Sequence, residues 1–270
     1  MDEGRSLRLG LVVNGDHPEA SEAAASLDAA ARAEGHSTTM ISLGRTAEVD
    51  VVVGVGGDGT LLEAAHIAHA SDLPVVGVNL GTVGYLTEFE PDELPVLLKV
   101  LAMEPSPERG RMTIRADAAE GQTWHGINDV VLEKVLSQRV VRIAVTIDGE
   151  YFTTYRADGI IVATPLGSTA YSLSVGGPVL APELEALVLS PVAPHSLLTR
   201  SLVLAPETVI EFEVASPRTV RINLDGREAC VLGEGEGLVV RKGKRPVRFI
   251  SLGTHPFPQG VRKQFGLDHA

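Results

Sequence analysis

The first segment suited to chemistry is glycine-rich and reads Gly54-Val55-Gly56-Gly57-Asp58-Gly59-Thr60. It follows a β-branched run, 49–55, that predicts a buried strand, and it precedes a predicted helix over 60–70. Glycines let the backbone approach a phosphate closely, and a helix start supplies N–H groups and a positive dipole. The segment therefore predicts a phosphate-binding loop formed by Gly56, Gly57, Gly59 and Thr60.

Asp58 is the candidate catalytic residue within this loop. Thr60 and Glu63 fit a capping box that would begin the helix, which leaves Asp58 just before the helix. A carboxylate beside bound phosphate is repelled unless it meets a metal ion or takes a proton. The alternative is an ordinary turn aspartate. A standard dinucleotide-binding oxidoreductase is disfavoured, because the next strand ends at Asn79 with no acid to bind a ribose.

A second candidate region is uncharged and polar, from 159 to 182. A neutral polar ligand is bound through hydroxyl, amide and carboxylate groups rather than through a basic groove. Asp158, at the start of the region, can accept from two donors, or it is simply a turn residue. Tyr171 offers a ring for stacking, or it is a core tyrosine. The candidate ligand-binding residues here are Thr169, Ala170, Tyr171, Ser172 and Ser174.

Polar residues outside this region complete the candidate set. Asn128 and Asp129 fall in a predicted strand, 127–131, whose alternation puts their side chains on opposite faces. Either both meet ligand at a strand end, or one is solvated. Arg139 and Arg156 are suited to offsetting a pyrophosphate charge, although exposed strand arginines are common.

These segments, taken together, resemble one family. The loop Gly56–Thr60 is similar to the phosphate loop of a kinase superfamily that includes NAD kinases, lipid kinases such as diacylglycerol and sphingosine kinases, and more distantly phosphofructokinase. The run 158–171, followed by Ser174 and Gly176-Gly177-Pro178, resembles the signature of NAD kinases specifically. Further similarities follow in order between about residues 50 and 230, at Asn79-Leu80-Gly81, Gly84-Tyr85-Leu86, Asn128-Asp129, Pro194-His195-Ser196-Leu197 and Asp225-Gly226.

The resemblance implies an enzyme that phosphorylates the adenosine 2′-hydroxyl of NAD with ATP or another phosphate donor, to give NADP. Asp58 would orient the hydroxyl and accept its proton late, because a carboxylate is far too weak a base to ionise an alcohol beforehand. A divalent cation, Mg²⁺, would bridge the donor phosphates. The dinucleotide would contact Asn128, Asp129, Asp158, Asp225 and the 169–174 segment. A homodimer or homotetramer is expected from the family.

Three positions depart from the family pattern. Glu63 stands where a basic residue is common, Asp129 where Glu is usual, and Leu166 where Thr is usual. Glu63 and Leu166 keep open one alternative, a non-catalytic NAD(P)-sensing relative. A second alternative, a lipid or sphingoid-base kinase, would share the glycine loop and the two-domain plan. It should show an apolar pocket or a membrane-facing patch, and the polar 164–174 segment argues against it.

The elements that must position these residues fall into two predicted domains. Residues 1–104 alternate strand and helix patterns, which predicts an α/β domain with a parallel sheet and flanking helices. Residues 105–252 show short alternating runs separated by Asp-Gly turns, which predicts an all-β, sandwich-like domain. Two short helices are expected in it, near 168–174 and 182–187. The last segment, 253–270, is expected to pack back on the first domain.

Composition limits the partners. The chain has 270 residues and a net charge of −12, and a general nucleic-acid or anionic-membrane binder would need a basic surface instead. Its single cysteine, Cys230, excludes an internal disulfide. No targeting segment is apparent at the start, so a cytoplasmic location is expected.

Overall fold

The computed structural model describes residues 6–15, 17–45, 47–80, 89–136, 139–195, 198–253 and 257–267. Two compact units are present, one of residues 1–110 with 247–270, the other of residues 111–246. The sequence pattern had put the divisions at 104/105 and 252/253. Of the segments that carry the family resemblance, Gly81, Gly84–Leu86 and Ser196-Leu197 lie outside the described residues.

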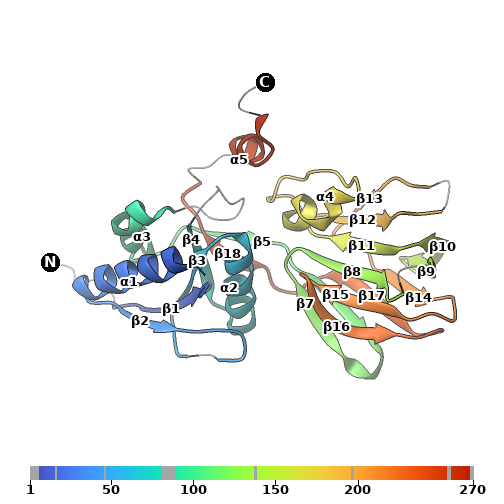
Figure 1. The fold of residues 1–270 in the computed structure, drawn as a ribbon, viewed down its shortest axis with the longest axis horizontal. Coiled ribbons are helices and arrows are strands. Elements are labelled where there is room, and N and C mark those ends of the chain that lie inside the picture. The colour runs from blue at the N-terminus through green and yellow to red at the C-terminus, as the bar shows by residue number, and fades with distance from the viewer. Residues whose placement is uncertain are drawn as a thin grey trace. The chain divides into compact units, whose positions relative to one another are not determined.

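The first unit is built on a six-stranded sheet (Figure 1). Neighbouring strands pair in parallel from β2 to β18, which confirms the predicted α/β architecture. The strands are, in spatial order, β2 (Ser37–Met40), β1 (Arg8–Val13), β3 (Val51–Gly56), β4 (Pro74–Asn79), β18 (Val247–Ile250) and β5 (Glu108–Arg111).

Helices cover both faces of this sheet. On one face, α1 (Pro18–Ala33) and α3 (Leu94–Leu101) pack on Leu9, Val53 and their neighbours, and the short η1 (Pro91–Glu93) leads into α3. On the other face lies α2 (Asp58–Ser71), which approaches so closely that a Cβ on Gly54 would meet the Leu61 Cα at 3.1 Å. Burial on both faces explains the continuous apolar run of β3. The last helix of this unit is α5 (Phe257–Gln264).

The second unit consists of two antiparallel six-stranded sheets (Figure 1). A core of alternating aliphatic side chains with the fully buried Tyr155 lies between them, which confirms the predicted all-β sandwich. One sheet contains, in order, β10 (Glu150–Ala157), β9 (Val141–Ile147), β14 (Ile210–Val214), β17 (Gly237–Lys242), β6 (Ile114–Ala118) and β7 (Thr123–Gly126). The other contains β13 (Leu202–Leu204), β12 (Leu187–Val192), β11 (Gly159–Ala163), β8 (Asp129–Lys134), β15 (Val220–Leu224) and β16 (Arg227–Leu232).

Short helical turns interrupt this unit at η2 (Ala119–Gly121), η3 (Leu166–Thr169) and α4 (Tyr171–Ser174). The last two correspond to the helix predicted near 168–174. The helix predicted at 182–187 is wrong, because residues 182–186 form a turn and an irregular stretch that leads directly into β12. Among the described residues, no helix combines the length and apolar character needed to cross a membrane.

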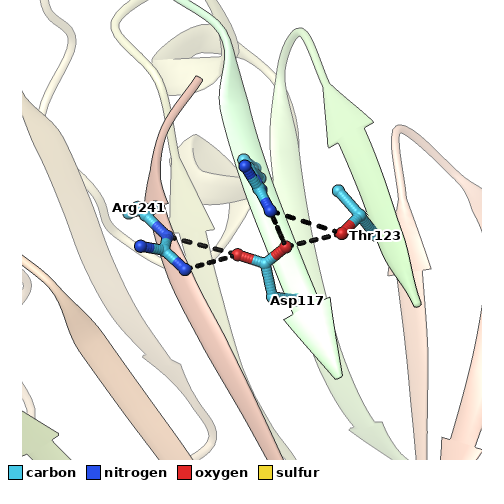
Figure 2. A network of polar contacts seen from close by, with 4 residues as sticks. Asp117, Thr123 and Arg241 are labelled. Atoms are coloured by element: carbon cyan, nitrogen blue, oxygen red, sulfur yellow. Dashed lines mark hydrogen bonds and ion pairs between the residues drawn. The ribbon is translucent and has the colours of Figure 1, made fainter. Parts of the chain in front are cut away.

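A polar network on β6, β7 and β17 ties the first sheet of the second unit together (Figure 2). The Asp117 carboxylate accepts from Arg115 Nε, Thr123 Oγ1 and Arg241 Nη2, each at 2.7 Å. Burial alone would raise the pKa of this carboxyl, but the hydrogen bonds from Thr123, Arg115 and Arg241 outweigh it and lower the pKa to about 2.

This network predicts a pH-dependent contribution to stability. Asp117 ionises near pH 3.8 when unfolded, so its contribution is fully present above that pH and is lost as the pH falls toward 2. We expect Asp117→Asn to lower the free energy of unfolding by about 1–2 kcal/mol at pH 7, allowing for solvent screening. Urea unfolding at pH 7, 5 and 3 should show the difference between the two proteins shrinking at the lowest pH. A difference independent of pH would contradict the assignment.

Candidate active site

The glycine-rich loop borders a hollow of about 460 Å³ at the carboxyl end of the parallel sheet. The strand order places β2 on one side of β1 and β3 on the other, so the connections diverge at the ends of β1 and β3. Ligands of open α/β sheets bind at such a switch point. The hollow is lined by Val13, Asn14, Gly15, His17, Glu19, Ala20, Gly56, Gly57, Gly59, Thr60, Glu63 and Leu80.

The loop differs from the sequence expectation in where the helix begins. Gly57 is the N-cap and α2 starts at Asp58, so the predicted capping box with Thr60 as N-cap is wrong. Instead, Thr60 packs on Gly56, where a Cβ would lie 2.5 Å from the Thr60 Oγ1. The extended Gly57 caps the helix three residues before Thr60, and its carbonyl accepts the N–H of Thr60 at 3.0 Å. Asp58 therefore stands in the first turn of α2, half-buried, rather than ahead of it.

The charges around the hollow suit an anionic ligand that binds as a complex with a metal cation. Glu19 and Glu63 are among the lining residues, and these include neither Lys nor Arg. Within the described part of the chain, no group of three or more His, Cys, Asp or Glu side chains is arranged to hold a metal ion. Mg²⁺ commonly binds through one or two carboxylates together with substrate phosphates, and the residues present fit that mode rather than an all-protein cage.

Sequence reasoning missed one wall of this hollow. Its lining includes Asn14, His17 and Glu19, which follow β1 and lead into α1, and none of them is among the candidate residues predicted from the sequence. The rule that ligands bind where the carboxyl ends of β1 and β3 meet would have indicated these residues, because they follow β1 directly.

In the second unit, Asp225 is bonded to the segment that carries Asn128 and Asp129. Its carboxylate accepts the backbone N–H groups of Ile127 at 2.6 Å, Asn128 at 2.8 Å and Asp129 at 2.9 Å. Asp129 begins β8 and Asn128 precedes it, so the prediction that both residues lie within a strand over 127–131 is wrong for Asn128. The N–H groups of Ile127 and Asn128 donate to the Asp225 carboxylate, and these two residues form a bend that ends where β8 starts.

The Asp129 side chain is buried, at 5% exposure. Burial raises the pKa of its carboxyl to about 7, and the negative charge of Asp225 adds to the effect. At neutral pH a substantial share of this group is therefore protonated and able to donate a hydrogen bond.

The raised pKa predicts that Asp129→Asn stabilises the protein at alkaline pH. The unfolded carboxyl ionises near pH 3.8, so the wild type loses stability as the pH rises from there to about 7. Asn carries no such charge. The free energy of unfolding of the variant minus that of the wild type should therefore be larger at pH 8 than at pH 4, by up to about 4 kcal/mol. Urea unfolding at the two pH values checks this, and an equal difference at both would refute it.

The 169–174 segment spans the end of η3 and α4. Tyr171 is 41% exposed, and Ser174 is exposed as well. Ser172 is fully buried and its hydroxyl lies 3.2 Å from that of Ser190, so packing within the unit occupies this side chain. Thr169 and Ala170 are half-buried.

The structure places Arg139, Arg156 and Asp158 apart from Asn128. Asp158 accepts from Lys134 Nζ at 2.6 Å, and Lys134 ends the strand that Asp129 begins. At about 3.3 Å per residue, these two ends of β8 are about 17 Å apart. The two arginines border a separate hollow of about 630 Å³ together with Arg142 and Arg218.

Two family models match the chain, and the second match extends through β18, which belongs to the first unit. Residues 36–104 match the family model described as the ATP-NAD kinase N-terminal domain, and residues 127–252 match the ATP-NAD kinase C-terminal domain. An NAD kinase of Heliobacterium modesticaldum is 37% identical over 276 residues, covering 95% of this chain and 97% of its own. An NAD kinase of Gemmatimonas aurantiaca is 36% identical over 224 residues, covering 81% and 78% respectively.

Two solved structures share the fold. A yeast NADH kinase complexed with NADH superimposes with a TM-score of 0.88 at 22% identity, over 98% of this chain and 89% of that one. An NAD kinase from Archaeoglobus fulgidus in complex with ATP gives a TM-score of 0.72 at 25% identity, over 97% and 98%.

Proposed function

This chain belongs to the NAD kinase family, and on that premise we propose that it transfers a phosphoryl group from ATP to the 2′-hydroxyl of the adenosine ribose of NAD, giving NADP. The observation that carries the proposal is the hollow at the ends of β1 and β3, which is lined by the glycine loop and the start of α2. Asp58 stands in the first turn of that helix, between the lining residues Gly57 and Gly59, although it is not itself one of the residues that line the hollow. A lipid or sphingoid-base kinase is disfavoured, because the relatives found over most of the chain are NAD kinases.

In the proposed reaction, Gly56, Gly57 and Gly59 let the loop backbone approach the donor phosphates, and the start of α2 supplies N–H groups and a positive dipole. Thr60 supports the loop by packing on Gly56. Mg²⁺, held by the donor phosphates with Glu63 or Asp58 nearby, would neutralise charge on the transferred group. Asp58 hydrogen-bonds the attacking hydroxyl, aligns its oxygen with the terminal phosphorus and takes the proton as the new bond forms.

The dinucleotide is proposed to bind to the second unit through Asn128, Asp129 and the 169–174 segment. A carboxyl at Asp129 that is partly protonated both donates and accepts, which suits a ribose hydroxyl. Tyr171, 41% exposed, offers its ring for stacking on a base.

We assign Arg139, Arg156 and Asp158 to the dinucleotide through a second copy of the chain. Within one copy, Asp158 and Asn128 lie at opposite ends of the β8 and β11 pair. The simplest way for both to contact one ligand is for a second copy of the chain to contribute Arg139, Arg156 and Asp158. This supports a homodimer or homotetramer, which light scattering on the purified protein would test. We also propose a cytoplasmic location, which the single cysteine supports because it leaves no internal disulfide to form.

The function is tested by incubating the purified protein with ATP, Mg²⁺ and NAD and measuring NADP. Parallel reactions with polyphosphate, NADH and sphingosine separate the donor, the redox state of the acceptor and the lipid-kinase alternative. NAD binding without any NADP would instead indicate a sensing relative.

A further inference from the structure

The segment 127–129 is fixed from its N–H side by one carboxylate. Asp225 accepts all three consecutive backbone N–H groups at 2.6 to 2.9 Å, and its own N–H donates to the Asp129 carbonyl at 3.1 Å. Asp225 lies in the turn between β15 and β16, far from this segment in sequence. Hydrogen bonds to an ionised acceptor are stronger than neutral ones, so this contact holds the segment firmly.

The same segment is fixed from its carbonyl side by Thr164. The Thr164 hydroxyl donates to the Ile127 carbonyl at 2.7 Å, and the Thr164 N–H donates to the Asn128 carbonyl at 2.8 Å. The hydroxyl also accepts the Gly167 N–H at 3.1 Å, which links the segment to the start of η3. Thr164 is completely buried. The segment 127–129 is thus clamped between Asp225 and Thr164.

The clamp leaves one side-chain acceptor without a partner. The Oδ1 of Asn128 is buried, and no hydrogen bond to it is formed in the described part of the chain. A buried acceptor that lacks a donor is costly, and such groups are retained where a ligand supplies the donor. The ligand group that fits is a hydroxyl or an amine, both of which a dinucleotide carries.

We propose that Asp225 and Thr164 are positioning residues, which hold the Asn128 amide and the Asp129 carboxyl in the orientation that receives the dinucleotide. This inference rests on the proposed function. It revises the sequence expectation for Asp225, because the carboxylate serves the backbone of 127–129 instead of contacting the ligand directly.

The test compares Thr164→Val with Thr164→Ser. Valine keeps the shape but removes the hydroxyl, whereas serine keeps the hydroxyl. We expect Thr164→Val to raise the Kd and KM for NAD about 10-fold while kcat and the KM for ATP stay within about twofold. Thr164→Ser should restore NAD binding to within about threefold of the wild type. Hydrogen exchange of the amides of 127–129 should be faster in the valine variant and near normal in the serine variant.

A companion variant separates positioning from direct contact. Asp225→Asn removes the charged acceptor, so it should speed amide exchange at 127–129 and weaken NAD binding together. Weaker NAD binding with unchanged exchange would overturn the inference by making Asp225 a contact residue. Equal losses in Thr164→Val and Thr164→Ser would overturn it as well. If the wild type makes no NADP, the proposed function fails, yet exchange and NAD binding still decide whether the clamp exists.

Discussion

Asp58→Asn is expected to lower kcat by at least about 100-fold while the Kd for NAD changes by less than about twofold. Asparagine keeps the size of the side chain and a carbonyl oxygen that can still receive a hydroxyl hydrogen bond. It cannot take the proton that the hydroxyl must release as the phosphoryl group is transferred. The loss should therefore appear in the chemical step and not in substrate binding.

The position of Asp58 makes this result specific. It stands in the first turn of α2, just after β3, and its neighbours Gly57 and Gly59 line the hollow proposed to hold the donor phosphates. A negative side chain there also interacts favourably with the helix dipole, so the variant should lose only about 0.3–1 kcal/mol of stability. That loss is too small to explain a 100-fold change in a folded enzyme.

A matched control is available at the other end of the same helix. Asp72 is the C-cap of α2 with a left-handed backbone, a conformation that Asn adopts readily. Asp72→Asn removes the same charge from the same helix and should leave NADP formation within about twofold of the wild type. Near-normal turnover in Asp58→Asn, measured by single-turnover kinetics with saturating NAD, would remove Asp58 from the mechanism.

The sequence predicts the glycine-rich turn between β3 and α2 well because local chemistry dictates it. A β-branched run buried on both faces, followed by glycines, permits few structures besides a strand that turns into a helix. The predicted start of α2 is wrong. A capping box at Thr60 and Glu63 satisfies the local preferences as well as an N-cap at Gly57 does, so the sequence does not distinguish the two starts. Packing of Thr60 on Gly56 separates the two, and that contact depends on the backbone path through Gly56 and Gly57, which the residue types alone do not fix.

The site in the second unit depends on contacts between residues far apart in the chain. Nothing near Asp225 in the sequence indicates that its carboxylate binds the N–H groups of 127–129, almost a hundred positions earlier. Likewise, the family resemblance identifies Asp158 as a candidate residue but does not reveal its distance from Asp129. The pairing of β8 with β11 places the two residues at opposite ends of these strands. Motifs name candidate residues, but strand register decides which of them meet.

Gly167→Ala is the second change with a large expected effect. A Cβ at Gly167 would lie 2.0 Å from the carbonyl oxygen of Asn128 and 2.6 Å from its Cα. These are backbone atoms held by Asp225 and Thr164, so they cannot move away as a flexible side chain would. Either η3 or the 127–129 segment must shift, and both carry proposed dinucleotide contacts. We expect the Kd for NAD to rise at least about 50-fold, since misplacing such groups by about 1 Å is costly.

Gly233→Ala makes the same substitution in the same unit without this conflict. The added Cβ would contact only the end of the Glu236 side chain, at 3.4 Å, so NAD binding should remain normal. ATP binding reports on the other unit and should persist in both variants, which shows that a loss of NAD binding in Gly167→Ala is local. Calorimetric titration with each nucleotide measures this. Unaltered NAD affinity in Gly167→Ala would contradict the proposed dinucleotide site, because either η3 or the 127–129 segment must shift to accommodate the methyl group and both carry proposed contacts.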